Sequence, residues 1–430
     1  MRNMEFKPIV GMVGIGNRLD REQNMDYQTV INRVRNLDLE FIDGGIEAEG
    51  KEIKFPIEEP RRKDLDVLLI VVLQGMSAEL IKEIVEIMDC PCILWAVKGR
   101  WAWPSSVLAL GRLQEKKRVK LLYQIGDGGD VLAEFEKTLR AAFALSRLRK
   151  SRIGQIGSLF PNLIACDYDE GVIESKLGIK LVKIGFDRLR DGVDSISRNT
   201  SLLQELKEKI MSEFIVKTTE DVLMSGIRLH LALKTIAEED DLHGFATECW
   251  SAMPKEMGLN PCLGFIEDDY VLGCEGDVLI CVATLMVKYL TAINPYVGDL
   301  YDLDEDNILT LVHCGGPASL CAKNKRTFIK ESAQAKEQGF STAVCLPWLN
   351  KGPATVFRLY GKGCDWVHAV NGQLTQVVRQ EKMWVRVRLS GEPKKFLENC
   401  LANHYVVVPR NVLDELRILC KWLQIRIVES

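Results

Sequence analysis

Residues 274–300 read CEGDVLICVATLMVKYLTAINPYVGDL, and they set the plan of the chain. The apolar run 278–290 has the length and composition of a buried helix. Carboxylates bracket it, with Glu275 and Asp277 before it and Asp299 after it. Acids beside a buried helix cost free energy unless a positive group, usually a metal ion, lies between them. The alternative is that Glu275 and Asp277 are first-turn acids favoured by the helix dipole, with Asp299 in a turn.

The composition is that of an ordinary globular protein. The chain has 430 residues, of which 47% are hydrophobic and 27% charged, and this length predicts two to four domains at roughly 150 residues each. A net charge of -4 gives no electrostatic case for nucleic acid or an anionic membrane as a partner. No apolar run approaches the roughly 18 residues needed to span a bilayer. Thirteen scattered cysteines and a start without a signal-peptide pattern predict a cytoplasmic protein.

Residues 1–149 alternate between strand-like and helix-like segments. The segment Asp64–Gln74 (DLDVLLIVVLQ) is a near-continuous apolar run, as expected of a parallel strand buried on both faces. Cys92–Val97 and Val119–Ile125 are two further short runs, each followed by a polar or glycine-rich loop. This alternation predicts a first Rossmann-like domain with a doubly wound parallel sheet.

Ligands on such sheets bind beyond the carboxyl ends of the strands. That rule places four loops along one rim of the predicted first domain: Asn17-Arg18, Gln74-Gly75, Lys98-Gly99-Arg100 and Asp127-Gly128-Gly129.

Residues 150–290 predict a second Rossmann-like α/β domain that carries Glu275. Gly154-Gln155-Ile156-Gly157 does not complete GxGxxG, and no GxxxxGK[ST] occurs, so we expect no nucleotide cofactor. Glu248, beside Trp250, is either a ligand or acid/base group or a carboxylate used for capping or hydrogen bonding.

Residues 291–430 predict a C-terminal, mainly antiparallel β domain that carries Asp299 and His404. Leu309–His313 and Thr355–Gly361 are short strand-like runs, and Trp384–Ser390 (WVRVRLS) alternates cleanly between apolar and polar residues.

Two of the five histidines are placed where they could bind a ligand. His313 ends an apolar strand before a glycine loop, and His404 follows Asn403 at the start of another strand. A histidine at a strand end is more often structural than a ligand. Together with two carboxylates, however, one or two imidazoles form an oxygen and nitrogen site that suits Mn²⁺, Mg²⁺ or Co²⁺ better than zinc.

These segments resemble the L-fucose isomerase family and, more distantly, the L-arabinose isomerases. Glu275 and Asp299 lie 24 positions apart (275 to 299), which matches the spacing of the family's metal-binding Glu and Asp. The resemblance extends to three other segments: the strand and glycine loop LTLVHCGGPASL (309–320), the segment Ala402-Asn403-His404 that would carry the metal histidine, and Ile153–Ile184 at the start of the second domain.

The resemblance implies an enzyme, a sugar isomerase that interconverts an aldose of the fucose or arabinose type and its ketose through an enediolate. Mn²⁺, with Mg²⁺ or Co²⁺ as alternatives, would be held by Glu275, Asp299 and His404. Glu275 and Asp299 would be the carboxylates that move the proton between C1 and C2.

The family's active sites lie between subunits, which implies a homo-oligomer in which the first domain of a neighbour covers the site. The substrate-binding residues predicted on this basis and from the chain itself are Arg18, Trp95, Lys98, Arg100, His313, Asn403 and Glu248.

The chain would be a divergent, shortened member of this family. It has Gly276 where the fucose enzymes tend to have asparagine, and His313 where arabinose isomerases have a further histidine ligand. There are two alternative functions. One is a non-catalytic sugar-binding or regulatory protein on the same fold, and the other is an isomerase of an anionic or phosphorylated sugar.

Overall fold

The computed structural model describes residues 6–47, 64–113, 115, 117–125 and 130–430. The chain divides into two compact units. Of the described residues, one unit comprises those up to Arg147 together with Asp414–Trp422, and the other comprises Leu148–Leu413 with Leu423–Ser430. The predicted rim loop 127–129 lies outside the described residues.

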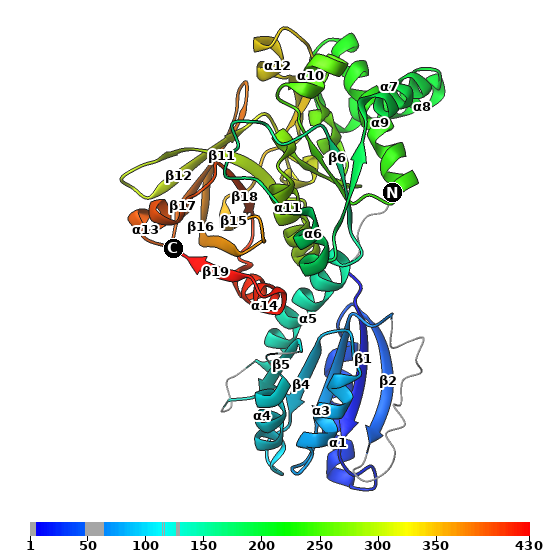
Figure 1. Ribbon diagram of the computed structural model, residues 1–430, viewed down its shortest axis with the longest axis vertical. Coiled ribbons are helices and arrows are strands. Elements are labelled where there is room, and N and C mark those ends of the chain that lie inside the picture. Colours follow the sequence, from blue (N-terminus) through cyan, green and yellow to red (C-terminus); the bar gives the residue numbers. More distant parts are fainter. Residues whose placement is uncertain (1–5, 48–63, 114, 116, 126–129) are drawn as a thin grey trace. The chain divides into compact units, whose positions relative to one another are not determined.

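The N-terminal unit is built on a parallel sheet with the strand order β2-β1-β3-β4-β5 (Figure 1). The parallel strand predicted within Asp64–Gln74 is confirmed as β3 (VLLIVV), since every residue of it is buried. A parallel strand covered on both faces requires this uninterrupted apolar run. The elements of the unit are β1 (Ile9–Ile15), α1 (Arg21–Arg35), β2 (Glu40–Glu47), β3 (Val67–Val72), α3 (Ala78–Glu86), β4 (Cys92–Ala96), α4 (Ala102–Leu113), β5 (Val119–Tyr123), α5 (Val131–Leu148) and α14 (Leu413–Leu423).

The second unit begins with another parallel sheet, ordered β10-β9-β6-β7, beside a three-stranded sheet ordered β14-β13-β8. The mixed α/β class predicted for this part of the chain is therefore confirmed. Its elements as far as the central helix are β6 (Arg152–Ile156), α6 (Glu170–Val172), the π-helical turn η1 (Ile173–Leu177), β7 (Lys180–Ile184), α7 (Phe186–Ser197), α8 (Thr200–Glu213), β8 (Ile215–Lys217), α9 (Glu220–Asp240), β9 (Gly244–Thr247), α10 (Ala252–Met257), the 3₁₀ turn η2 (Pro261–Ile266), β10 (Val271–Gly273), the 3₁₀ turn η3 (Cys274–Gly276) and α11 (Val278–Thr291).

The predicted antiparallel C-terminal domain is a closed six-stranded barrel. Its strands follow the order β15-β18-β11-β12-β17-β16, and β16 pairs back onto β15, so the ring has no free edge (Figure 1). The alternation in WVRVRLS places Val385 and Val387 in the core and leaves Arg386 and Arg388 exposed. The remaining elements are β11 (Tyr296–Leu303), β12 (Ile308–His313), η4 (Ala318–Leu320), β13 (Phe328–Glu331), α12 (Ala333–Glu337), β14 (Ala343–Leu346), β15 (Gly352–Tyr360), β16 (Trp366–Arg379), β17 (Met383–Leu389), α13 (Pro393–Asn399), β18 (His404–Val408) and β19 (Arg426–Glu429).

The helix α11 joins the parallel sheet to the barrel. All of its residues are buried, and it contacts β9 and β10 on the one hand and β15 and β18 on the other (Figure 1). A helix that is apolar all round must be covered on every side. This packing gives a physical reason why the predicted segments 150–290 and 291–430 belong to one compact unit.

The described part of the chain contains no helix that is both long and apolar enough to cross a membrane.

Candidate metal centre

Glu275 lies two residues after β10, in the turn η3 at the carboxyl end of the second parallel sheet, where such sheets place their ligand sites. Its backbone has the left-handed φ of 59°, and the next residue, Gly276, has a φ of 72°. A Cβ on Gly276 would come within 2.2 Å of the Ser158 carbonyl oxygen, so only glycine fits this close approach. Burial raises the pKa of Glu275, an effect that His404 opposes and Asp299 reinforces.

Asp299 and His404 face each other across the paired strands β11 and β18. The Nε2 atom of His404 lies 3.5 Å from Oδ1 of Asp299 and 4.0 Å from Oε2 of Glu275. The side-chain amide of Asn403 donates a hydrogen bond of 2.7 Å to Asp299 Oδ1. The structure thus brings the three predicted metal ligands together from three separate elements.

His313 joins this group from the end of β12. Its ring centroid is 6.1 Å from that of His404, and one ligand atom from each of Asp299, His313 and His404 lies within 4.8 Å of the others. Within the described residues these three form the only group of this compactness among His, Cys, Asp and Glu side chains, so Glu275 lies slightly outside it. Burial lowers the pKa of His313 to about 4, which favours the neutral imidazole that can act as a ligand.

Two buried nitrogen atoms of this group have no hydrogen-bond partner among the described residues: Nε2 of His404 and Nδ1 of His313. An unpaired polar atom in a protein interior is costly and calls for an explanation such as an ion. Imidazole lone pairs beside a carboxylate are the donor set that divalent transition ions prefer. The residues present therefore fit a divalent cation.

Asp277 contacts His404 through the ring nitrogen that does not face Asp299. Its Oδ1 accepts a hydrogen bond from the Ile280 amide, which caps α11, and its Oδ2 lies 3.0 Å from Nδ1 of His404. Arg358 makes a two-pronged ion pair with the same carboxylate. Burial acts to raise the pKa of Asp277, but Arg358 and then His404 outweigh it and hold that pKa well below its usual range. Burial acts to lower the pKa of His404, whereas the hydrogen bond to Asp277 and the charges of Asp277, Asp299 and Glu275 raise it.

Sequence reasoning did not find Arg358 and gave Asp277 only a supporting role in the first turn of the helix. A signal for Arg358 was present in the sequence. It is the one charged residue of the apolar strand segment TVFRLYG (355–361), and a buried arginine requires a partner.

The structure assigns Glu248 to the second of the two roles left open for it. Its carboxylate accepts hydrogen bonds from the amides of Ser251 and Ala252 and from the Ser251 hydroxyl at the start of α10. These bonds give Glu248 a capping role, and none of them tests its prediction as a substrate contact.

The predicted rim residues of the N-terminal unit have different surroundings. Trp95 is 5% exposed within β4 and packs against Phe135, so it cannot stack on a sugar and its prediction as a substrate contact was wrong. Arg18 and Lys98 are exposed. Every residue of β4 (Cys92–Ala96) is buried, so the exposed rim begins only after Ala96.

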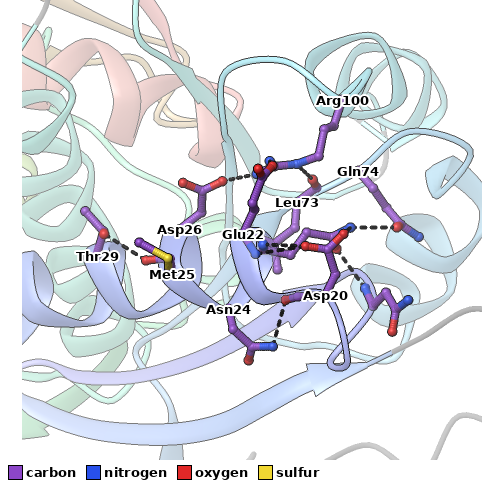
Figure 2. Close-up of polar contacts among 11 residues, drawn as sticks. Asp20, Glu22, Asn24, Met25, Asp26, Thr29, Leu73, Gln74 and Arg100 are labelled. Carbon is purple, nitrogen blue, oxygen red and sulfur yellow. Dashed lines mark hydrogen bonds and ion pairs between the residues drawn. The ribbon is translucent and has the colours of Figure 1, made fainter.

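Arg100 is held within the unit, as Figure 2 shows. Its Nε donates to the carbonyl oxygen of Leu73 at 3.0 Å, and its guanidinium forms ion pairs with Glu22 and Asp26 of α1. The arginine therefore ties α1 to the end of β3. These contacts engage Nε, Nη1 and Nη2 of Arg100 within the unit, and none of them tests the prediction that Arg100 binds a sugar.

Comparisons with known proteins leave the family open. No protein-family model matches the chain, and no curated protein matches it. One similar solved structure is an ABC transporter solute binding protein from Burkholderia multivorans, with an unknown ligand. The two chains are 11% identical with a TM-score of 0.19 over 67% of this chain and 95% of the other, a likeness too weak to support an argument.

Proposed function

We propose that this chain is a metal-dependent aldose–ketose isomerase acting on a sugar of the fucose or arabinose type. One observation carries the proposal: buried Nε2 of His404 and Nδ1 of His313 have no hydrogen-bond partner among the described residues, and one nitrogen of each ring groups with a carboxylate oxygen of Asp299 within 4.8 Å. The resemblance to the L-fucose isomerase family supplies the reaction, and the site supplies the residues that the reaction needs.

Asp299, His313 and His404 would hold the ion, with Glu275 as a fourth group at its edge. Mn²⁺ is our first choice, followed by Mg²⁺ or Co²⁺, because the set mixes carboxylate oxygen with imidazole nitrogen and lacks thiolates. When bound, such an ion acts as a Lewis acid that stabilises negative charge on the sugar oxygens O1 and O2.

Glu275 is the better placed of the two carboxylates to move the proton. Asn403 and the compact ligand group engage Asp299, whereas Glu275 lies outside that group. A carboxylate oxygen of Glu275 takes the proton from C2 of the aldose and returns it to C1. The hydroxyl proton passes from O2 to O1, so that the ketose forms with no net gain or loss of atoms.

The proposal also includes the fold type of the two parallel sheets, the oligomeric state and the cellular compartment. Both parallel sheets would be doubly wound, Rossmann-like units, and the order β2-β1-β3-β4-β5 of the first is one of the common doubly wound orders. The resemblance alone supports a homo-oligomer in which Arg18 and Lys98 of a neighbour reach the sugar. Thirteen free thiols favour the cytoplasm as the compartment.

The test begins with protein stripped of metal by a chelator. Binding of Mn²⁺ is measured by equilibrium dialysis, and the reloaded protein is offered a panel of free aldoses and their phosphate esters, with ketose formation followed by NMR. We expect saturable Mn²⁺ binding and a ketose product that disappears when the chelator is added.

Each other outcome has a meaning. Conversion of phosphate esters alone would favour the isomerase of an anionic sugar. Sugar binding without any ketose would favour the non-catalytic sugar-binding protein. Failure to bind Mn²⁺, Mg²⁺ or Co²⁺ at all would overturn the proposal.

A further inference from the structure

We propose that Arg358 is a positioning residue which, through Asp277, fixes the ring proton of His404 on Nδ1 and leaves Nε2 bare toward Asp299 and Glu275. The inference rests on the proposed function only where it takes the bare Nε2 of His404 to be a metal ligand. The arrangement itself can be measured without any metal or sugar.

The three side chains form a fully buried chain of contacts. The side chains of Arg358, Asp277 and His404 are each 0% exposed. Nη1 of Arg358 lies 2.7 Å from Oδ2 of Asp277, Nη2 lies 3.1 Å from Oδ1, and Nδ1 of His404 lies 3.0 Å from Oδ2. The imidazole of His404 therefore links Asp277 to the metal centre.

The other donors around Asp277 decide the tautomer. Two guanidinium N–H groups of Arg358 and the backbone N–H of Ile280 can act only as donors, and all three point at the Asp277 carboxylate. The carboxylate therefore serves as an acceptor, so Nδ1 of His404 must carry the proton that it shares with Oδ2. In a neutral imidazole the lone pair then lies on Nε2.

This tautomer directs the lone pair of His404 Nε2 toward the candidate metal centre. Nε2 is buried without a hydrogen-bond partner among the residues described, and it faces Asp299 at 3.5 Å. A histidine that binds a metal through one nitrogen usually donates its other N–H to a carboxylate, which fixes the orientation of the ring. Asp277 occupies that supporting position here.

Arginine suits the end of this chain of contacts better than lysine. Its planar fork engages both oxygens of Asp277 at once, so the carboxylate cannot rotate away from His404. A buried ion pair is weak evidence for stability, because desolvation offsets much of the attraction. Arg358 on β15, Asp277 at the start of α11 and His404 on β18 instead lock together the elements that meet at the centre.

The experiment records long-range ¹H–¹⁵N spectra of the metal-free full chain labelled at histidine. The chain has only five histidines, and the His404→Gln variant assigns the signal of interest. At an alkaline pH, where the imidazole is neutral, we expect His404 in the wild type to show a protonated Nδ1 and a bare Nε2. Asp277→Asn and Arg358→Lys should each populate the other tautomer, and both should lower Mn²⁺ affinity by about tenfold or more.

A matched control is Arg379→Lys, which alters a partly buried arginine of the same barrel that donates to the carbonyl oxygens of Arg326 and Leu346. It should leave the His404 signals and the Mn²⁺ affinity unchanged. A wild-type spectrum of the neutral ring with the proton on Nε2 and none on Nδ1 would overturn the inference, even if the variants do not fold. An unchanged tautomer in folded Arg358→Lys and Asp277→Asn would overturn it too. The expected tautomer without any Mn²⁺ binding would instead count against the proposed function alone.

Discussion

Asp299 and His404 are cross-strand partners on β11 and β18, and this pairing places Oδ1 of Asp299 3.5 Å from Nε2 of His404. Directly opposed residues in an antiparallel pair project from the same face of the sheet. The register of two barrel strands therefore builds half of the candidate metal centre. The other half comes from Glu275 after β10 and His313 at the end of β12.

Substitution of Asp299 and substitution of Glu275 should affect different properties, Mn²⁺ affinity in the first case and turnover in the second. Asp299→Asn should lower Mn²⁺ affinity by at least about tenfold. Even the loss of a residue that only hydrogen-bonds to a metal ligand typically lowers metal affinity that much. Glu275→Gln should keep most of the affinity and lower kcat by ~10²–10⁴-fold, because it removes the group that moves the proton. Equilibrium dialysis and turnover measurements separate the two effects. Asp302→Asn, which changes an exposed acid on the same strand, is the control and should alter neither quantity.

His313→Gln tests the second imidazole. Its Nδ1 is buried and unpaired among the described residues, so we expect the variant to bind Mn²⁺ at least about tenfold more weakly while folding normally. His243→Gln, which changes a histidine bonded to the backbone of Arg152, should bind the ion as the wild type does. Equal affinity in the two variants would remove His313 from the ligand set.

Gly276→Ala should disturb the Glu275 turn. The left-handed backbone alone costs an alanine about 1 kcal/mol, and the new Cβ would also collide with the Ser158 carbonyl oxygen at 2.2 Å. Gly258→Ala provides the control and bears only the backbone cost, because Gly258 also has a positive φ, 63°, but nothing lies within 4 Å of where its Cβ would stand. Urea unfolding should show the larger loss for Gly276→Ala, together with weaker Mn²⁺ binding. A loss no larger than that of Gly258→Ala would show that the turn adjusts freely.

His368 should make the protein less stable in acid. Burial lowers its pKa from 6.5 to about 4, and its two ring nitrogens are hydrogen-bonded to the hydroxyls of Tyr405 and Ser430. Between pH 6.5 and 4 the unfolded chain binds a proton at this residue and the folded chain does not. The free energy of unfolding therefore decreases as the pH is lowered across that window. The loss from this group is at most about 3.4 kcal/mol by the relation between pKa shifts and free energy.

The measurement compares the free energy of unfolding at about pH 7.5 and about pH 4.5, on either side of most of that window, in the wild type and in His368→Gln. The variant should be less stable than the wild type at neutral pH, where hydrogen bonds are lost, yet show a smaller fall on acidification. A fall as steep as that of the wild type would mean that His368 is not a source of the acid sensitivity.

Arg100→Met should act on stability. The arginine joins the Leu73 carbonyl oxygen to acids of α1, and its loss should cost about 1 kcal/mol, as expected for partly exposed hydrogen bonds and ion pairs. Arg18→Met, at an exposed position of the same rim, should leave the melting temperature unchanged. If Arg18 of a neighbour contacts the sugar, that variant should instead raise KM. An unchanged melting temperature for Arg100→Met would contradict the role seen in Figure 2.

The sequence by itself determined the class of each segment. The uninterrupted run VLLIVV specified a strand covered on both faces, the run after Asp277 specified a buried helix, and the alternation in WVRVRLS specified an antiparallel strand with one face inward. These outcomes follow from local periodicity, which a single stretch of chain displays. The resemblance carried by the order and spacing of Glu275 and Asp299, with His404, also indicated the candidate site.

Only the tertiary structure decided which side chains meet. Strand register places His404 opposite Asp299, barrel closure brings in His313 and Arg358, and the capping position of Asp277 turns its carboxylate onto the imidazole. The same packing removes Trp95 from the rim and engages Arg100 and Glu248 in structural bonds. Such contacts join residues that are far apart in the chain, and their geometry depends on how whole elements pack, so local sequence patterns do not contain it.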